Sequence, residues 1–214
     1  MTLLASGLMG FSCGVEGVGD PCIPEDEYDE NFSGFSSPEV NVESRSFSCV
    51  TRICLVNHFQ GRVSCPYGQS QERADECAAN PAACSDPNSP QYKSSCRKPG
   101  QDGTKADDWI KEAVPPQLVE RRADDAVYCS CRCDGPDAGA RYCECPDGFS
   151  CERLVDDIGL GKGQLAGSYC VKSSERYNPQ KPPNPANLCD NGTAEAAGTL
   201  PGNCGSDGSN PPLQ

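Results

Sequence analysis

The sequence has few of the residues that build most enzyme active sites and metal centres. It contains one histidine, His58, and one tryptophan in 214 residues. The usual catalytic zinc site uses several histidines, so no metal site of that kind is expected. A cysteine hydrolase with Cys54 as nucleophile and His58 as base would need a free thiol. A disulfide is the expected state of Cys54, so we expect a non-enzymatic protein without a cofactor.

Basic residues are also scarce. The chain has 18 Lys and Arg against 31 Asp and Glu, which gives a formal net charge of −13. Nucleic acids and anionic membrane surfaces attract clusters of Lys and Arg. We therefore expect no nucleic-acid partner and no charge-driven binding to an anionic membrane.

Cysteine, glycine and proline are abundant, with 17, 22 and 19 residues, whereas hydrophobic residues make up only 36% of the chain. Burial of so little apolar surface hardly offsets the entropy of ordering the backbone. One cysteine, Cys13, lies apart from the rest. The other sixteen form an even set, which predicts structural disulfides in an exported protein; they are Cys22, Cys49, Cys54, Cys65, Cys77, Cys84, Cys96, Cys129, Cys131, Cys133, Cys143, Cys145, Cys151, Cys170, Cys189 and Cys204.

The first twelve residues are apolar and uncharged. This matches the hydrophobic region of a signal peptide and is too short to span a bilayer. The string Gly10-Phe11-Ser12-Cys13 resembles the lipobox of bacterial lipoproteins. The resemblance implies cleavage before Cys13, a lipid on its sulfur, and attachment to the bacterial outer membrane on its periplasmic or outer side. In the alternative, the leader is an ordinary signal peptide that is cleaved off, the protein is secreted, and Cys13 forms a disulfide.

The composition divides the remaining chain into four parts. A run of like charges usually marks a solvated segment, and an acidic run falls at 25–30. Many prolines after residue 178 indicate an irregular tail, in which Cys189 and Cys204 are expected to pair. The expected parts are an acidic flexible spacer at 13–46, a Cys-rich hairpin with a short helix at 47–100, a helix with a Cys-rich β-ribbon at 101–172, and a tail at 173–214.

Two hairpins and two helices are predicted within these parts. Residues 47–56 and 62–65 flank a turn at Gln60-Gly61, an arrangement in which Cys49 and Cys65 face each other. A helix is expected from Gln69 to Asn80, ending before Pro81. Thr104 and Asp107 have the spacing of a helix-capping box, which predicts another helix. Trp109 is expected to be a core residue of this helix.

The second hairpin is expected from alternating cysteines at 129–133 and 143–151, joined by a loop at 134–140. Cysteines two apart on one strand lie about 6.6 Å apart, near the upper limit for a disulfide. Each should therefore pair outside its own strand, with Cys151 and Cys170 among the candidate partners. The overall expectation is a small disulfide-rich fold, mostly irregular, with short β-hairpins, a few short α-helices and extended loop-rich N- and C-terminal segments.

The string from Cys143 to Cys151, with Pro146, Gly148 and Phe149, is similar to the closing hairpin of EGF-type modules. The wider cysteine spacing is similar to dickkopf-like modules. Together with the leader, the chain resembles Cys-rich bacterial envelope lipoproteins, which implies an envelope location and no specific activity. We expect a structural or binding role there, with the membrane reached through a lipid on Cys13 and with another envelope or extracellular protein as the partner.

Two alternatives remain open from the sequence. The loop from Asp134 to Ala140 suits an extracellular protease inhibitor, and a small Cys-rich enzyme belongs to the same class of alternatives. Cysteine thiolates would also suit a soft metal such as zinc or copper(I), although an oxidising compartment favours disulfides. The candidate thiolates are Cys129, Cys131, Cys133, Cys143 and Cys145.

Overall fold

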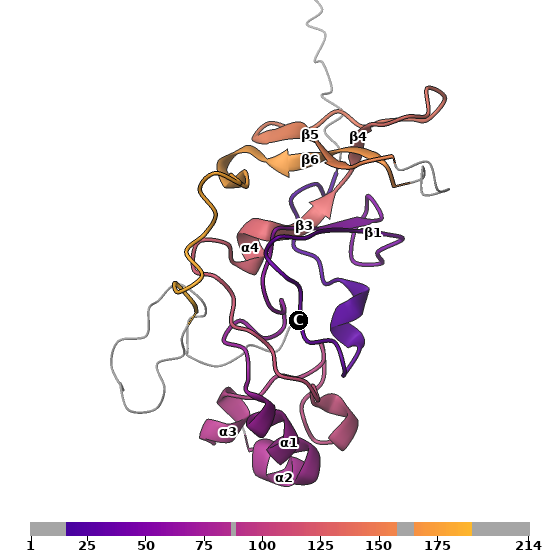
Figure 1. Ribbon diagram of the computed structural model, residues 1–214. Coiled ribbons are helices and arrows are strands. Elements are labelled where there is room, and N and C mark those ends of the chain that lie inside the picture. The colour runs from indigo at the N-terminus through magenta and orange to yellow at the C-terminus, as the bar shows by residue number, and fades with distance from the viewer. Residues whose placement is uncertain (1–15, 87–88, 158–164, 190–214) are drawn as a thin grey trace, which may run out of the picture.

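The computed structural model describes residues 16–86, 89–157 and 165–189 (Figure 1). Two small antiparallel sheets lie one above the other, with a group of short helices below them. The first sheet has the order β1-β2-β3 and the second β4-β6-β5. The strands are β1 (Val40–Ser44), β2 (Ile53–Asn57), β3 (Val127–Ser130), β4 (Arg132–Asp134), β5 (Phe149–Val155) and β6 (Gly167–Lys172). This confirms a small, disulfide-rich, loop-rich fold.

The first sheet is built around β2, whose last four residues are buried. Its neighbours are β1 and β3, with Cys54 opposite Cys129. The predicted hairpin with residues 62–65 is therefore wrong, as is the expected meeting of Cys49 and Cys65. Residues 62–65 form a tight turn instead, whereas β1 and β3 each offer β2 a longer ladder of backbone hydrogen bonds.

The hairpin predicted from residues 129–133 and 143–151 is also wrong, because these segments do not pair with each other in the second sheet. The central strand of this sheet is β6, which pairs with β4 and β5 and is buried at its first five positions. Residues 141–145 form no strand, and Cys143 donates only one backbone hydrogen bond, to Arg132. The cysteines alternate there because of how the disulfides are placed, not because the segment is a strand. Strand β6 takes the central place in the sheet and contributes Tyr169 and Val171 to the buried interior.

The helices are short. Helix α1 (Gln71–Ala79) agrees with the prediction: the Ser70 hydroxyl accepts a hydrogen bond from the Arg73 N–H, and the helix ends before Pro81. The others are α2 (Pro81–Cys84), α3 (Pro90–Lys93) and α4 (Ala123–Ala126), with 3-10 turns at Glu25–Tyr28, Ala106–Asp108 and Ser173–Glu175.

The helix predicted from Thr104 is wrong, because only the 3-10 turn Ala106–Asp108 forms there. The Asp102 carboxylate accepts hydrogen bonds from the Thr104 N–H and hydroxyl, which closes a local turn in place of a helix start. Trp109 follows in an irregular segment and is buried beside Cys77 and Cys84, in agreement with its predicted core role.

The expected acidic spacer is, from residue 16 onward, part of the folded body. It contributes strand β1 and the 3-10 turn Glu25–Tyr28. The Glu27 side chain is fully buried against Arg62. Glu25, Asp26 and Asp29 are exposed, as expected of an acidic run, but Glu27 is buried against the Arg62 guanidinium and fixes the run to the folded body.

Seven disulfides cross-link the described residues, and each layer of the molecule has its own. Of the three near the second sheet, one joins β4 to β5, one joins β6 to Cys145, and one joins Cys131, which directly precedes β4, to Cys143. The pairs are Cys22–Cys54, Cys49–Cys129, Cys65–Cys96, Cys77–Cys84, Cys131–Cys143, Cys133–Cys151 and Cys145–Cys170. As predicted, Cys129, Cys131 and Cys133 each pair outside their own strand.

Three sequence predictions involve residues that the structure does not describe. They are the cleaved leader at 1–12, the lipid on Cys13, and the pairing of Cys189 with Cys204. Cys189 itself is buried and disulfide-bonded. Within the described ranges, none of the helices has the length and apolar character needed to cross a membrane.

Candidate binding groove

A groove of about 320 Å³ opens between the 3-10 turn Glu25–Tyr28, strand β1 and the loop that follows β1. Three of its lining side chains are hydrophobic. Phe47 is 91% exposed and Tyr28 is 52% exposed, and Ile23 is partly buried. Because these hydrophobic side chains line one groove and are not scattered singly over the surface, the groove is a candidate binding surface.

Two disulfides hold the walls of this groove. Cys22, next to Ile23, is bonded to Cys54 in β2, and Cys49, two residues after Phe47, is bonded to Cys129 in β3. The sulfur atoms of Cys22, Cys49 and Cys129 lie within 4.8 Å of one another. Both walls are thus fixed to the same buried point of the first sheet.

Hydrogen bonds complete the shape of the groove. The Glu25 N–H donates to the Glu43 carboxylate at 3.1 Å, which joins the turn to β1. The backbone N–H groups of Arg45 and Ser46 both donate to the Arg52 carbonyl, which closes the loop carrying Phe47. The groove is therefore formed before any partner arrives, which lowers the entropy cost of binding.

The polar side of the groove is acidic. Burial raises the pKa of Glu43, the hydrogen bond from the Glu25 N–H opposes this, and the charges of Glu25 and Asp26 raise it further. Among the residues that the structure describes, none forms a salt bridge with Glu43. A carboxylate that is partly desolvated and lies near other acids is stabilised by an incoming cation.

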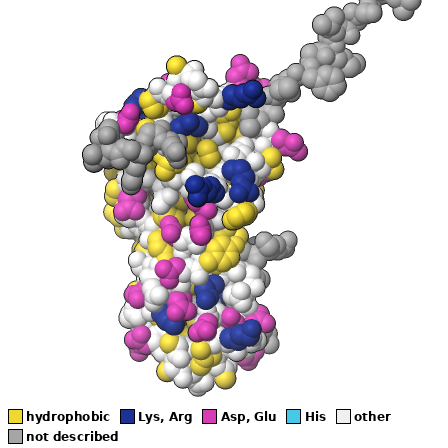
Figure 2. Space-filling model, turned by 90° about the vertical axis from the view of Figure 1, so that its right-hand side faces the viewer, with side chains coloured by type: hydrophobic (Ala, Val, Ile, Leu, Met, Phe, Trp, Pro, Cys, Tyr) yellow, Lys and Arg dark blue, Asp and Glu magenta, His cyan; other side chains and the backbone are white. Residues whose placement is uncertain are grey.

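Figure 2 shows the face that carries β1 and the Glu25–Tyr28 turn. Hydrophobic side chains are exposed on it next to both acidic and basic ones. One basic neighbour already contacts the groove, since the Arg52 guanidinium lies 4.7 Å from the centre of the Phe47 ring. The Phe47 ring therefore accepts a cation over one of its faces.

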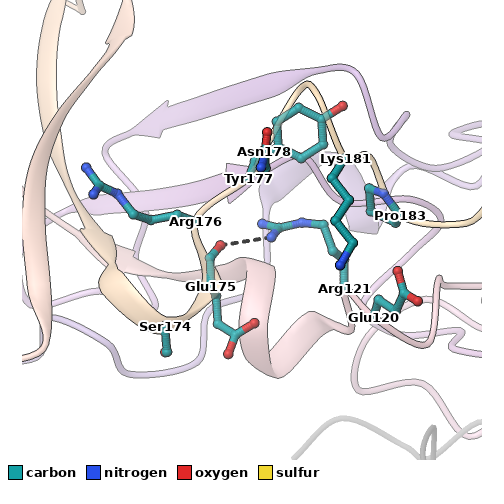
Figure 3. Close-up of a pocket in the computed structure, with 9 residues that line it drawn as sticks. All are labelled: Glu120, Arg121, Ser174, Glu175, Arg176, Tyr177, Asn178, Lys181 and Pro183. Atoms are coloured by element: carbon teal, nitrogen blue, oxygen red, sulfur yellow. Dashed lines mark hydrogen bonds between the residues drawn. The ribbon is translucent and has the colours of Figure 1, made fainter.

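A second pocket, of about 260 Å³, lies where the C-terminal segment meets the body (Figure 3). Its central side chain is Arg121, whose guanidinium donates to the carbonyls of Asn57, His58 and Glu175. These bonds tie the segment after β6 to the first sheet. Because Arg121 is occupied by backbone carbonyls, we assign this pocket a structural role.

The single histidine contacts Tyr177, which lines this second pocket. The His58 ring stacks on Tyr177 with 3.6 Å between ring centres, and its Nδ1 lies 3.0 Å from the Ser37 carbonyl. Burial lowers the pKa of His58, the bond to Ser37 opposes this, and the Arg121 charge lowers it further. Cys54, the nucleophile considered with His58, is bonded to Cys22.

Three disulfides of the second sheet lie in a row. The Cys170 sulfur lies 3.6 Å from that of Cys131 and 3.7 Å from that of Cys143, which are bonded to each other. Cys170 is bonded to Cys145, whose sulfur lies within 4.8 Å of those of Cys133 and Cys151. Cys145–Cys170 is thus the middle member of the row, which we call the sulfur row. In this state the proposed metal thiolates are engaged in disulfides.

The sequence did not indicate the groove. Fourteen of the sixteen predicted disulfide cysteines are joined in pairs, but Ile23, Tyr28 and Phe47 were assigned to a spacer and to a hairpin. The one available signal was the presence of aromatic residues within a polar, acidic stretch next to cysteines.

Comparisons with protein-family models, with curated proteins and with solved structures gave no match. The candidate site therefore depends on the geometry of the chain itself.

Proposed function

We propose that this chain is a non-enzymatic protein of the bacterial envelope that binds another envelope or extracellular protein. It is exported and held at the outer membrane by a lipid on Cys13, with a secreted form as the alternative. Seven disulfides support export, because such bonds persist in oxidising compartments. The anchor is supported by the string Gly10-Phe11-Ser12-Cys13.

The observation that carries the binding role is the preformed groove. It presents Tyr28 and Phe47 to solvent from walls fixed by Cys22–Cys54 and Cys49–Cys129. Exposed aromatic side chains on a rigid support are typical anchors of protein interfaces, because they bury a large area at a small entropy cost.

Site-specific photocross-linking in intact cells tests this proposal. A photoreactive phenylalanine analogue replaces Phe47 in one variant and Glu72, an exposed residue of α1, in the control. We expect one envelope protein to be linked at position 47 and not at position 72, and the purified pair to lose affinity with Phe47→Ala. Absence of a link at position 47, or the same link at both positions, would contradict the binding role.

The anchor has a separate test. The Cys13→Ser variant is expected to move from the outer-membrane fraction to the soluble fraction. Retention of that variant in the membrane would show that Cys13 carries no anchor.

A second candidate function is protease inhibition by the loop Asp134–Ala140. The specific observation in its favour is that the loop is largely exposed and follows Cys133, which is bonded to Cys151. The loop is also closed on itself, since the Ala140 N–H donates to the Asp137 carbonyl and the Tyr142 hydroxyl contacts the same residue. Assays against a panel of proteases test this function, and an absence of inhibition throughout the panel would remove it.

A further inference from the structure

The groove combines two chemical features that suit the same kind of partner. Phe47 and Tyr28 offer aromatic faces, and Glu25 and Glu43 place carboxylates in the same lining. Aromatic faces and carboxylates both attract ammonium and guanidinium groups. The Arg52 guanidinium over the Phe47 ring shows this attraction within the chain itself.

The partner is also expected to make an apolar contact with the groove. Ile23 and the two aromatic side chains leave a hydrophobic surface that a bare cation does not cover. An aliphatic or aromatic side chain of the partner would remove this surface from water, at about 25 cal/mol per Å² of apolar area. The occupant therefore carries positive charge and an apolar group close together.

The charge of the whole chain favours the same kind of partner. A net charge of −13 attracts a basic segment at long range and repels both a second copy of the chain and an anionic membrane surface. Among the possible occupants, a basic segment of another protein fits both the local and the overall charge.

We propose that the groove binds a basic segment of a partner protein in which Lys or Arg side chains flank an aliphatic or aromatic side chain. The inference rests on the proposed binding function and names the chemistry of its partner. Phe47 and Tyr28 hold the apolar side chain, and Glu25 and Glu43 pair with the cations.

The probe for this proposal is a fluorescent peptide of alternating Lys and Leu, measured by anisotropy against the folded chain. We expect it to bind more tightly than a peptide of Glu and Leu or one of Lys and Ser. Truncating an exposed aromatic anchor typically weakens binding by about tenfold, which is the effect expected of Phe47→Ala. We expect Glu43→Gln to weaken binding several-fold and Glu72→Gln on α1 to leave it unchanged.

Phe47 is almost fully exposed, so its replacement leaves the fold intact, which an NMR spectrum checks. Equal losses in Glu43→Gln and Glu72→Gln would show nonspecific charge attraction and overturn the proposal. Tight binding of the Glu and Leu peptide would do the same. So would a dimer of the chain that Phe47→Ala dissociates, because a second copy would then occupy the groove.

The cross-linking experiment separates this inference from the proposed function. A partner that is linked at position 47 through a neutral or acidic segment would contradict the inference and leave the binding function standing. A link through a segment with Lys or Arg beside an apolar residue supports both.

Discussion

At the scale of single residues, a buried ion pair joins Glu27 to Arg62. Both side chains are fully buried, with 3.4 Å between the Arg62 Nε and a Glu27 carboxylate oxygen. The same carboxylate accepts hydrogen bonds from the backbone N–H groups of Val63 and Ser64 and from the Ser64 hydroxyl. Burial raises the pKa of Glu27 and the Arg62 charge opposes this. The pair fixes the turn that forms one wall of the groove.

Replacing Glu27 by alanine is expected to destabilise the fold strongly. Loss of the carboxylate leaves the buried Arg62 guanidinium with backbone carbonyls as its hydrogen-bond partners and, among the described residues, no opposite charge in contact, and breaking a buried ion pair typically costs about 3–5 kcal/mol. The matched control is Glu76→Ala, which removes the partly exposed pair with Arg73 and should cost less than about 1 kcal/mol. Denaturant unfolding with the disulfides intact measures both, and similar losses in the two variants would contradict this account of the buried pair.

His58 predicts a specific dependence of stability on pH. Its folded pKa lies below the ordinary 6.5, mainly because of burial. The unfolded chain therefore binds a proton in the window between the two pKa values while the folded chain does not. The contribution of neutral His58 to stability is present above about pH 6.5 and is lost as the pH falls through the folded pKa.

The comparison variant is His58→Asn. His58 has a φ of 53°, a conformation that asparagine tolerates. Because the chain has a single histidine, we expect the fall in melting temperature between about pH 7 and pH 5.5 to be smaller in this variant. An unchanged pH profile would show that His58 does not contribute. NMR titration of the one imidazole in the native chain gives its folded pKa directly.

At the scale of elements, local signals were sufficient for α1 and insufficient for the sheets. A cap at Ser70 and a stop at Pro81 determine where α1 begins and ends, and both are visible within a few residues of sequence. The partners of β2 lie far apart along the chain, in β1 and β3. Period-two patterns identify a candidate strand but do not select its partner, because pairing depends on contacts that are distant in sequence.

The groove could not be predicted from the sequence either, because it also depends on contacts between residues that are distant in the chain. The sequence alone places Glu27 in a solvated acidic run, because its contact with Arg62, 35 residues later, is visible only in the structure. Once that contact and Cys22–Cys54 place the turn, Tyr28 and Phe47 come to line the same groove. Cysteine pairing has the same limit, since composition predicts that cysteines pair but not with which partner.

The sulfur row predicts where disulfide exchange begins. Cys151 is exposed, whereas Cys170 is fully buried and Cys131 is 7% exposed. Among the seven described disulfides, an external thiol should therefore open Cys133–Cys151 first, and the released Cys133 thiolate would lie next to the sulfur of Cys145. We expect early non-native pairs to involve only the six cysteines of the row.

Brief treatment with a monothiol, acid quenching and peptide mapping measure the order of opening. The double variant Cys133→Ser/Cys151→Ser should slow exchange at the other two bonds of the row, because it removes the exposed entry point. First opening of a buried pair such as Cys65–Cys96, or early exchange with Cys22 or Cys49, would contradict this order.

At the scale of the whole molecule, disulfides hold together a chain with several small cores. The largest buried cluster consists of nine residues, of which four are cysteines. Cys49–Cys129 closes a separation of 80 residues, for which the chain-entropy model gives about 4–5 kcal/mol. Cross-links thus supply stability that the limited apolar surface does not, and they fix the groove that the proposed function uses.

The most direct test of the central claim is the intact mass of the protein extracted from membranes, after alkylation in denaturant without reductant. The claim is an exported chain with a lipid on Cys13 and its other cysteines in disulfides. We predict a chain that begins at Cys13, carries the mass of acyl chains and takes up no alkylating reagent. A soluble chain without acyl mass that takes up the reagent at many cysteines would contradict the account.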